Sequence, residues 1–81
     1  MVDKRSVEDD ELASIMRLSD GREIVHRLMV YAGTDVDTFN VDPHIHAYNA
    51  GRRSIGTWLA DEVRNTCPDQ YITMIKEHTD D

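Results

Sequence analysis

The chain has 81 residues, a net charge of -7 and one cysteine, Cys67. The acidic balance argues against unaided binding to DNA, RNA or an anionic membrane, because phosphate contacts need clustered Lys and Arg. A lone cysteine excludes an intrachain disulfide, and the absence of an apolar leader or of an apolar run of roughly 18 residues predicts a cytosolic protein, or one carried in a particle assembled in a cytosol. A single domain of this size has a marginal core, so we expect self-association or a partner to add to its burial.

A first helix is predicted over about residues 7–18. Ser6 followed by Asp9 resembles a capping box, and the acidic run over residues 8–11 places negative charge where it favours the helix dipole. The short apolar face of this helix consists of Leu12, Ile15, Met16 and Leu18.

The tripeptide Ser19-Asp20-Gly21 predicts a turn, in which Ser19 or Asp20 caps a second helix over residues 22–32. Gly33 is then its C-terminal stop. The apolar residues of this helix are Ile24, Val25, Leu28, Met29 and Ala32. In the loop over residues 34–41 we expect Phe39 to plug one end of the core.

Two further helices are predicted by prolines at first helical positions, in Asp42-Pro43 and in Thr66-Cys67-Pro68. The first runs over residues 43–65 and is the longest, and the second runs over residues 68–77. The inward side of the last helix is expected to carry Tyr71, Ile72 and Ile75. No alternating run or hairpin signal indicates a strand. The sequence therefore predicts one all-α domain of four helices over residues 1–81, with frayed termini at 1–6 and 78–81.

Two glycines interrupt the long helix, in the stretch Asn49-Ala50-Gly51-Arg52-Arg53-Ser54-Ile55-Gly56. Each interior glycine costs roughly 1 kcal/mol of helix stability relative to alanine. Gly51 and Gly56 therefore indicate either a close approach of another backbone or a partner site. The apolar stripe that they interrupt, projected at 100° per residue, consists of Ile45, Tyr48, Arg52, Ile55, Gly56, Leu59 and Val63.

The adjacent arginines of this stretch fall on different sides of the helix. Arg52 lands inside the apolar stripe, where an unpaired charge is costly, so we expect it to be largely buried and paired with a carboxylate. The carboxylates near the ends of neighbouring elements are Asp20, Glu23 and Asp42. Arg53 falls on the flank with Asn49, either solvated or available to a partner.

Trp58 projects to another side of the long helix, together with Ala47 and Gly51. If exposed, it is a flat anchor beside a notch of small residues, and tryptophan is enriched in interface hot spots. In the alternative, the first helix or the loop over residues 34–41 covers it. The candidate partner-binding residues are Trp58, Gly51, Ala47 and Arg53, and the structural motif is formed by Asn49, Arg52 and Gly56.

Signals for metal binding or catalysis are weak. The histidines of His44-x-His46 point to nearly opposite sides of a helix, unlike a zinc pair. Asp35-x-Asp37 begins like a calcium loop but lacks the later oxygen ligands and the glycine. No nucleophile elbow, phosphate loop or dinucleotide fingerprint is present. We expect no metal, no cofactor and no enzymatic activity, with Cys67 a buried structural thiol.

The segments Tyr48-Asn49-Ala50-Gly51-Arg52-Arg53-Ser54-Ile55-Gly56 and Cys67-Pro68-Asp69-Gln70-Tyr71 together resemble a small domain of tailed bacteriophages, whose type member belongs to a Bordetella phage. The resemblance covers about residues 12–77. It implies a phage protein of the host cytoplasm or virion, a minor virion or morphogenesis component that binds other phage proteins. Because the chain is small and acidic, the alternative is a host-takeover protein that inhibits a basic host factor.

Overall fold

The computed structural model describes residues 4–34 and 39–79, which form four α-helices with no strand among them. The helices are α1 (Lys4–Arg17), α2 (Ser19–Ala32), α3 (Pro43–Thr66) and α4 (Pro68–Glu77). The prediction of an all-α domain with one long central helix is thereby confirmed. Asp35 and Asp37, whose spacing begins like a calcium loop, lie outside the described part of the chain, as do the extreme termini.

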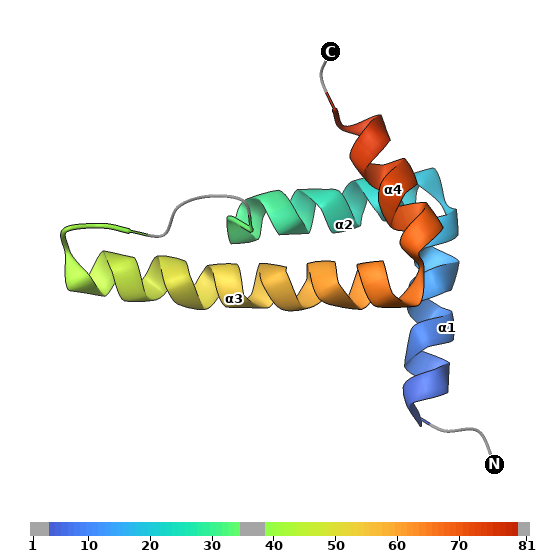
Figure 1. The fold of residues 1–81 in the computed structure, drawn as a ribbon, viewed down its shortest axis with the longest axis horizontal. Helices are drawn as coiled ribbons and strands as arrows, with labels where there is room; N and C mark the ends of the chain where they lie inside the picture. Colours follow the sequence, from blue (N-terminus) through green and yellow to red (C-terminus); the bar gives the residue numbers. More distant parts are fainter. Residues whose placement is uncertain (1–3, 35–38, 80–81) are drawn as a thin grey trace.

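The helices α2 and α3 lie side by side and antiparallel, and α1 and α4 gather at one end of this pair (Figure 1). The core is at that end, where all four helices contact one another. Its buried side chains are Met16, Val25, Met29, Ala60, Val63, Cys67 and Met74. The first turns of α3 extend beyond the end of α2, so much of the apolar surface there stays exposed (Figure 1).

The start of α2 differs from the prediction, because residues 19–21 are helical rather than a turn. Leu18, in extended conformation, separates α1 from α2, and neither Ser19 nor Asp20 caps the helix. Gly21 is buried at this corner, and a Cβ atom on it would overlap the carbonyl group of Ile15. The glycine therefore allows a tight corner between two helices.

The other helix ends are mostly as predicted. Gly33 ends α2 in the left-handed conformation with a φ of 71°. Asp42 caps α3 by accepting a hydrogen bond from the backbone nitrogen of His44 at 2.9 Å. At the other end of the chain α1 already begins at Lys4, so Ser6 lies inside the helix and forms no capping box.

Several apolar positions are exposed where burial was predicted. Phe39 is 72% exposed and plugs no end of the core. In α4, Ile72 and Ile75 face outward while Met74 is fully buried, so the predicted inward side was rotated by about one residue. Only Tyr71 of the predicted trio packs against the core.

The buried side of α3 is also narrower than its apolar stripe. It consists of Gly56, Ala60 and Val63, which recur at intervals of four and three residues and so share one side of the helix. Ile45 and Ile55, which the projection placed on the buried face, are exposed. Small residues govern this face because α2 approaches α3 closely there.

Candidate protein-binding site

Gly56 is the point where the end of α2 presses against α3. A Cβ atom on it would lie 2.8 Å from the Cβ of Ala32 and would overlap the hydroxyl of Thr34. That hydroxyl donates a hydrogen bond to the carbonyl oxygen of Met29 at 3.0 Å, so moving it would break a contact. The close approach indicated by the sequence is confirmed at this glycine.

Arg53 is exposed and also links α3 to the end of α2. Its Nε donates a hydrogen bond to the carbonyl oxygen of Thr34 at 3.1 Å. A cation beside the C-terminal end of α2 also complements the helix dipole. On a helix of 3.6 residues per turn, Arg53 lies roughly 140° around the axis from Trp58, so the two do not form one contact surface.

Arg52 lies half-buried between two aromatic rings. Its guanidinium carbon is 5.8 Å from the ring centroid of Tyr31 on α2 and 5.5 Å from that of Tyr48 on α3. Both distances are within the range of cation–π attraction. The Nε atom is buried and has no hydrogen-bond partner among the described residues. The guanidinium thus retains an unused donor.

The predicted carboxylate partner of Arg52 is therefore wrong for the described part of the chain. Glu23 is instead within contact distance of Arg27 and His78. The side chain of Asp42 caps α3. The prediction failed because much of the stripe around Arg52 is exposed, and the guanidinium lies against two aromatic rings instead of a buried carboxylate.

A groove of about 390 Å³ runs between α2 and α3 beside Arg52. Its floor is formed by Ala32 and Gly56, where the two helices touch. We call it the α2–α3 groove. Its walls are formed by Leu28, Tyr31, Arg52, Ile55, Trp58 and Leu59. Arg52 is the one charged residue among them. An apolar channel with a single cation in its wall suits an apolar segment that carries one negative group.

The side chain of Trp58 is at the rim of this groove and is 61% exposed. Neither α1 nor the described part of the loop before α3 covers it. Ala47 and Gly51 follow the same side of α3 and are exposed as well. No described atom lies within 4 Å of a Cβ built on Gly51, so no contact within the described chain requires a glycine there.

The contribution of α2 to the groove was missed in the sequence. Leu28 and Tyr31 are both exposed on that helix, at a spacing of three residues. Leu28 was named only among the apolar residues of the second helix, and Tyr31 was assigned no role. Their exposure depends on how α2 is rotated against α3, which the sequence of α2 does not specify.

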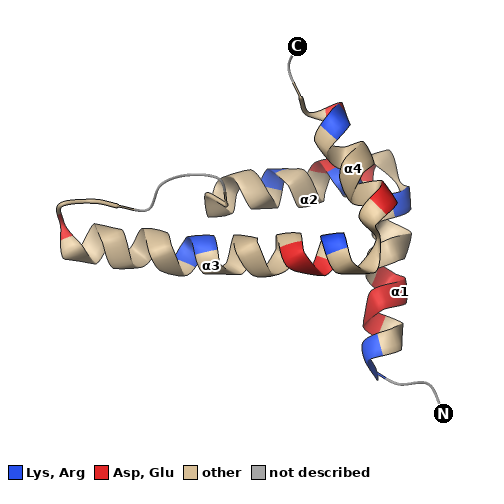
Figure 2. Cartoon of the chain, viewed as in Figure 1, with Lys and Arg blue, Asp and Glu red and all other residues tan. Residues whose placement is uncertain are grey.

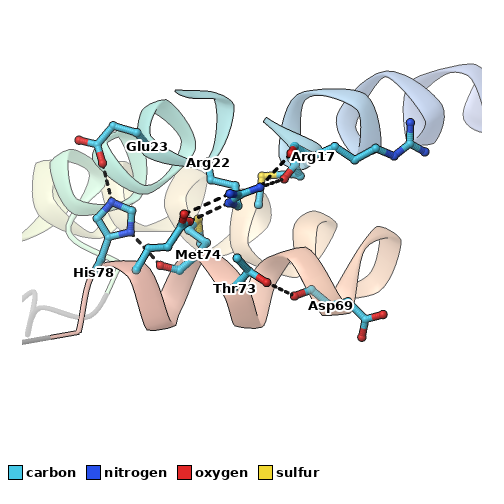
Figure 3. A network of polar contacts seen from close by, with 9 residues as sticks. Arg17, Arg22, Glu23, Asp69, Thr73, Met74 and His78 are labelled. Atoms are coloured by element: carbon cyan, nitrogen blue, oxygen red, sulfur yellow. Dashed lines mark hydrogen bonds and ion pairs between the residues drawn. The ribbon is translucent and has the colours of Figure 1, made fainter. Parts of the chain in front are cut away.

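A polar cluster outside the groove joins α2 to the ends of α1 and α4 (Figure 3). Arg22 donates two hydrogen bonds to the carboxylate of Glu77, at 2.7 and 3.1 Å. It donates two more to the carbonyl oxygens of Met16 and Arg17, at 2.9 and 3.0 Å. One guanidinium thus donates hydrogen bonds to carbonyl oxygens at the C-terminal end of α1 and also binds a carboxylate of α4. This arrangement is structural, since every contact is within the chain.

His78 completes that cluster between α4 and α2 (Figure 3). Its Nδ1 is 2.8 Å from the carbonyl oxygen of Met74, and its Nε2 is 2.5 Å from a carboxylate oxygen of Glu23. Both neighbours are acceptors when Glu23 is ionised, so the protonated ring, with hydrogen on both nitrogens, can donate to both of them. The hydrogen bond to Glu23, followed by that to Met74, raises the pKa of His78 above its ordinary value of 6.5.

Among residues 4–34 and 39–79, no three His, Cys, Asp or Glu side chains gather as a metal site. Cys67 is buried at the junction of α3 and α4, and desolvation raises the pKa of its thiol. None of the described helices is long and apolar enough to cross a membrane.

The chain is similar to a known family of phage proteins. The model of the family described as Bbp19-like phage protein matches residues 12–76. No curated protein and no solved structure matches the chain. The matched region includes the groove, the Gly51–Gly56 stretch and the polar cluster up to Lys76.

Proposed function

The chain belongs to the family of Bbp19-like phage proteins, and on that premise we propose that it is a non-enzymatic virion or morphogenesis component that acts by binding other proteins. The observation that carries this proposal is the exposed apolar α2–α3 groove with Trp58 at its rim. Large exposed apolar patches on small proteins mark interaction sites.

The residues around Trp58 support protein as the ligand. Tryptophan, tyrosine and arginine are the residue types most enriched in interface hot spots, and Trp58, Tyr31 and Arg52 all line the groove. The exposed Gly51 and Ala47 extend this surface along α3 and let a second helix approach closely. The net charge of -7 disfavours nucleic acid as the partner.

The experiment is a pull-down from phage-infected cells with the tagged wild-type chain, with Trp58→Ala, and with Ile72→Ala as control. Ile72 is also an exposed apolar residue, but it lies on α4 outside the groove. Mass spectrometry of the captured proteins and of purified particles gives the readout. Capture of portal or capsid proteins by wild type and Ile72→Ala, but not by Trp58→Ala, supports the proposal.

Three other outcomes would contradict the proposal. A single stoichiometric host protein in the pull-down would favour the host-takeover alternative. Absence of the chain from purified particles would contradict the virion role. Capture of partners that does not depend on Trp58 would contradict the assignment of the groove as the binding site.

A further inference from the structure

We propose that the α2–α3 groove is filled by helix α1 of a second copy of this chain. The inference rests on the proposed protein-binding role of the groove and names its first occupant. The charges on the chain select this occupant.

Figure 2 shows an acidic stretch within α1 and a basic stretch within α3. Arg52 is the charged group of the groove, and its buried Nε has no hydrogen-bond partner among the described residues. Acidic residues fill positions 8–11 of α1. An isologous contact of groove on groove would instead place Arg52 near its own copy, which like charge disfavours.

The outer side of α1 has the pattern that the groove requires. Val7, Glu11 and Ile15 recur at intervals of four residues and so share one side of the helix. All three are exposed, and the carboxylate of Glu11 lies between two apolar side chains. Glu11 forms no hydrogen bond or ion pair with another described residue. We call these three residues the α1 stripe.

The α1 stripe lies on the side of α1 opposite its contacts with α3. The other side of α1 is held to α3 by the contacts of Arg5 with Glu62 and of Thr66 with Asp9, each at 3.4 Å. Met16 on that side is fully buried in the core. The helix is therefore already fixed at the core end of the α2–α3 pair, and the α1 that enters the groove belongs to another copy. Docking would place Glu11 against Arg52 and cover Val7 and Ile15.

The test is sedimentation velocity over a concentration series, with circular dichroism as a check of folding. The variants are Glu11→Arg, Arg52→Glu, their equimolar mixture, and Asp10→Arg as a matched control. Asp10 has the same charge and lies on the same helix, but about 100° around the axis from Glu11. Wild type and Asp10→Arg should self-associate equally. Each single reversal at the contact should weaken association by at least about tenfold, because like charges then face each other.

The mixture provides the strictest result. The arginine introduced at position 11 of one variant would meet the glutamate introduced at position 52 of the other, and the unchanged Glu11 would meet the unchanged Arg52. The mixed chains should therefore associate where neither variant does alone. A monomeric wild type, a Glu11→Arg variant that associates like wild type, or a mixture no better than its parts would each overturn the inference.

Two features of the design keep the outcomes separate. Glu11 is exposed and unpaired within the described chain, so the Glu11→Arg variant is expected to fold. This variant therefore tests the inference even if Arg52→Glu fails to fold. A monomeric wild type would leave the proposed binding of other phage proteins intact, because the pull-down tests that role separately.

Discussion

Arg53 on α3 donates a hydrogen bond from Nε to the carbonyl oxygen of Thr34, 3.1 Å away, at the end of α2. This contact and the missing Cβ of Gly56 fix the two helices where the α2–α3 groove begins. We expect Arg53→Ala to lower the free energy of unfolding by about 0.5 kcal/mol, as for an exposed hydrogen bond. Urea denaturation measures this, with Arg64→Ala as an exposed arginine outside the junction for comparison. A neutral Arg53→Ala would show that the hydrogen bond adds nothing to the junction.

The two glycines of the long helix should respond oppositely to alanine. Gly51→Ala should raise the free energy of unfolding by about 1 kcal/mol, since no described atom is near and alanine favours the helix. Gly56→Ala should lower it by about 1 kcal/mol or more, because overlap with Thr34 outweighs the helix preference. Thermal and urea unfolding of both variants give the values. If the free energy of unfolding changed in the same direction in both variants, the assignment of the close approach to Gly56 would be contradicted.

Arg52 should matter less for folding than a buried ion pair would. We expect Arg52→Ala to lower the free energy of unfolding by about 1 kcal/mol, the scale of its contacts with Tyr31 and Tyr48. Breaking a buried pair would cost about 3–5 kcal/mol. Measurement at low protein concentration separates folding from association. A loss in the higher range would show that the guanidinium has a buried carboxylate partner after all.

The contact of α4 with α2 should depend on pH through His78. Its pKa is raised, so its contribution to stability is complete below pH 6.5 and is lost as pH rises through the higher value in the folded state. The pKa of Glu23 is lowered by its hydrogen bonds with His78 and then Arg27, so its contribution is present above pH 4.5 and lost in stronger acid. The pKa of Glu77 is lowered by Arg22 with the same sign. The contact is thus strongest between those two limits.

The corresponding measurement is the urea midpoint between about pH 6 and pH 8. The wild-type midpoint should fall as pH rises, and His78→Gln should flatten this decline. His44→Gln, at the far end of α3 from α4, should retain it. Parallel curves for wild type and His78→Gln would rule out this histidine as the titrating group.

Local signals in the sequence predicted the helices better than their packing. Prolines at helix starts and Gly33 at a helix end act through their own backbone, so α3 and α4 were predicted to within a residue of their observed ends. The corner at Gly21 was mistaken for a turn, because its glycine serves contact with Ile15, which is a tertiary requirement.

The site was only partly predictable for a related reason. The periodicity of α3 indicated that Gly56 and Trp58 fall on different sides, and the structure agrees. It could not indicate that no helix covers Ile55 and Tyr48, because exposure depends on the helices beside them. Because the packing of neighbouring helices could not be predicted, a buried ion pair was expected for Arg52. For the same reason the position of Tyr31 in the groove was not predicted.

The central claim is that the Trp58 side of the α2–α3 pair is covered when the protein acts. Trp58 is the only tryptophan, so its fluorescence reports on this surface alone. The most direct measurement is the emission maximum of the wild-type chain over a concentration series, with Glu11→Arg beside it. The account predicts emission typical of exposed indole in dilute solution, a shift to shorter wavelength as wild type associates, and no such shift for Glu11→Arg. Association that leaves the emission unchanged would contradict it.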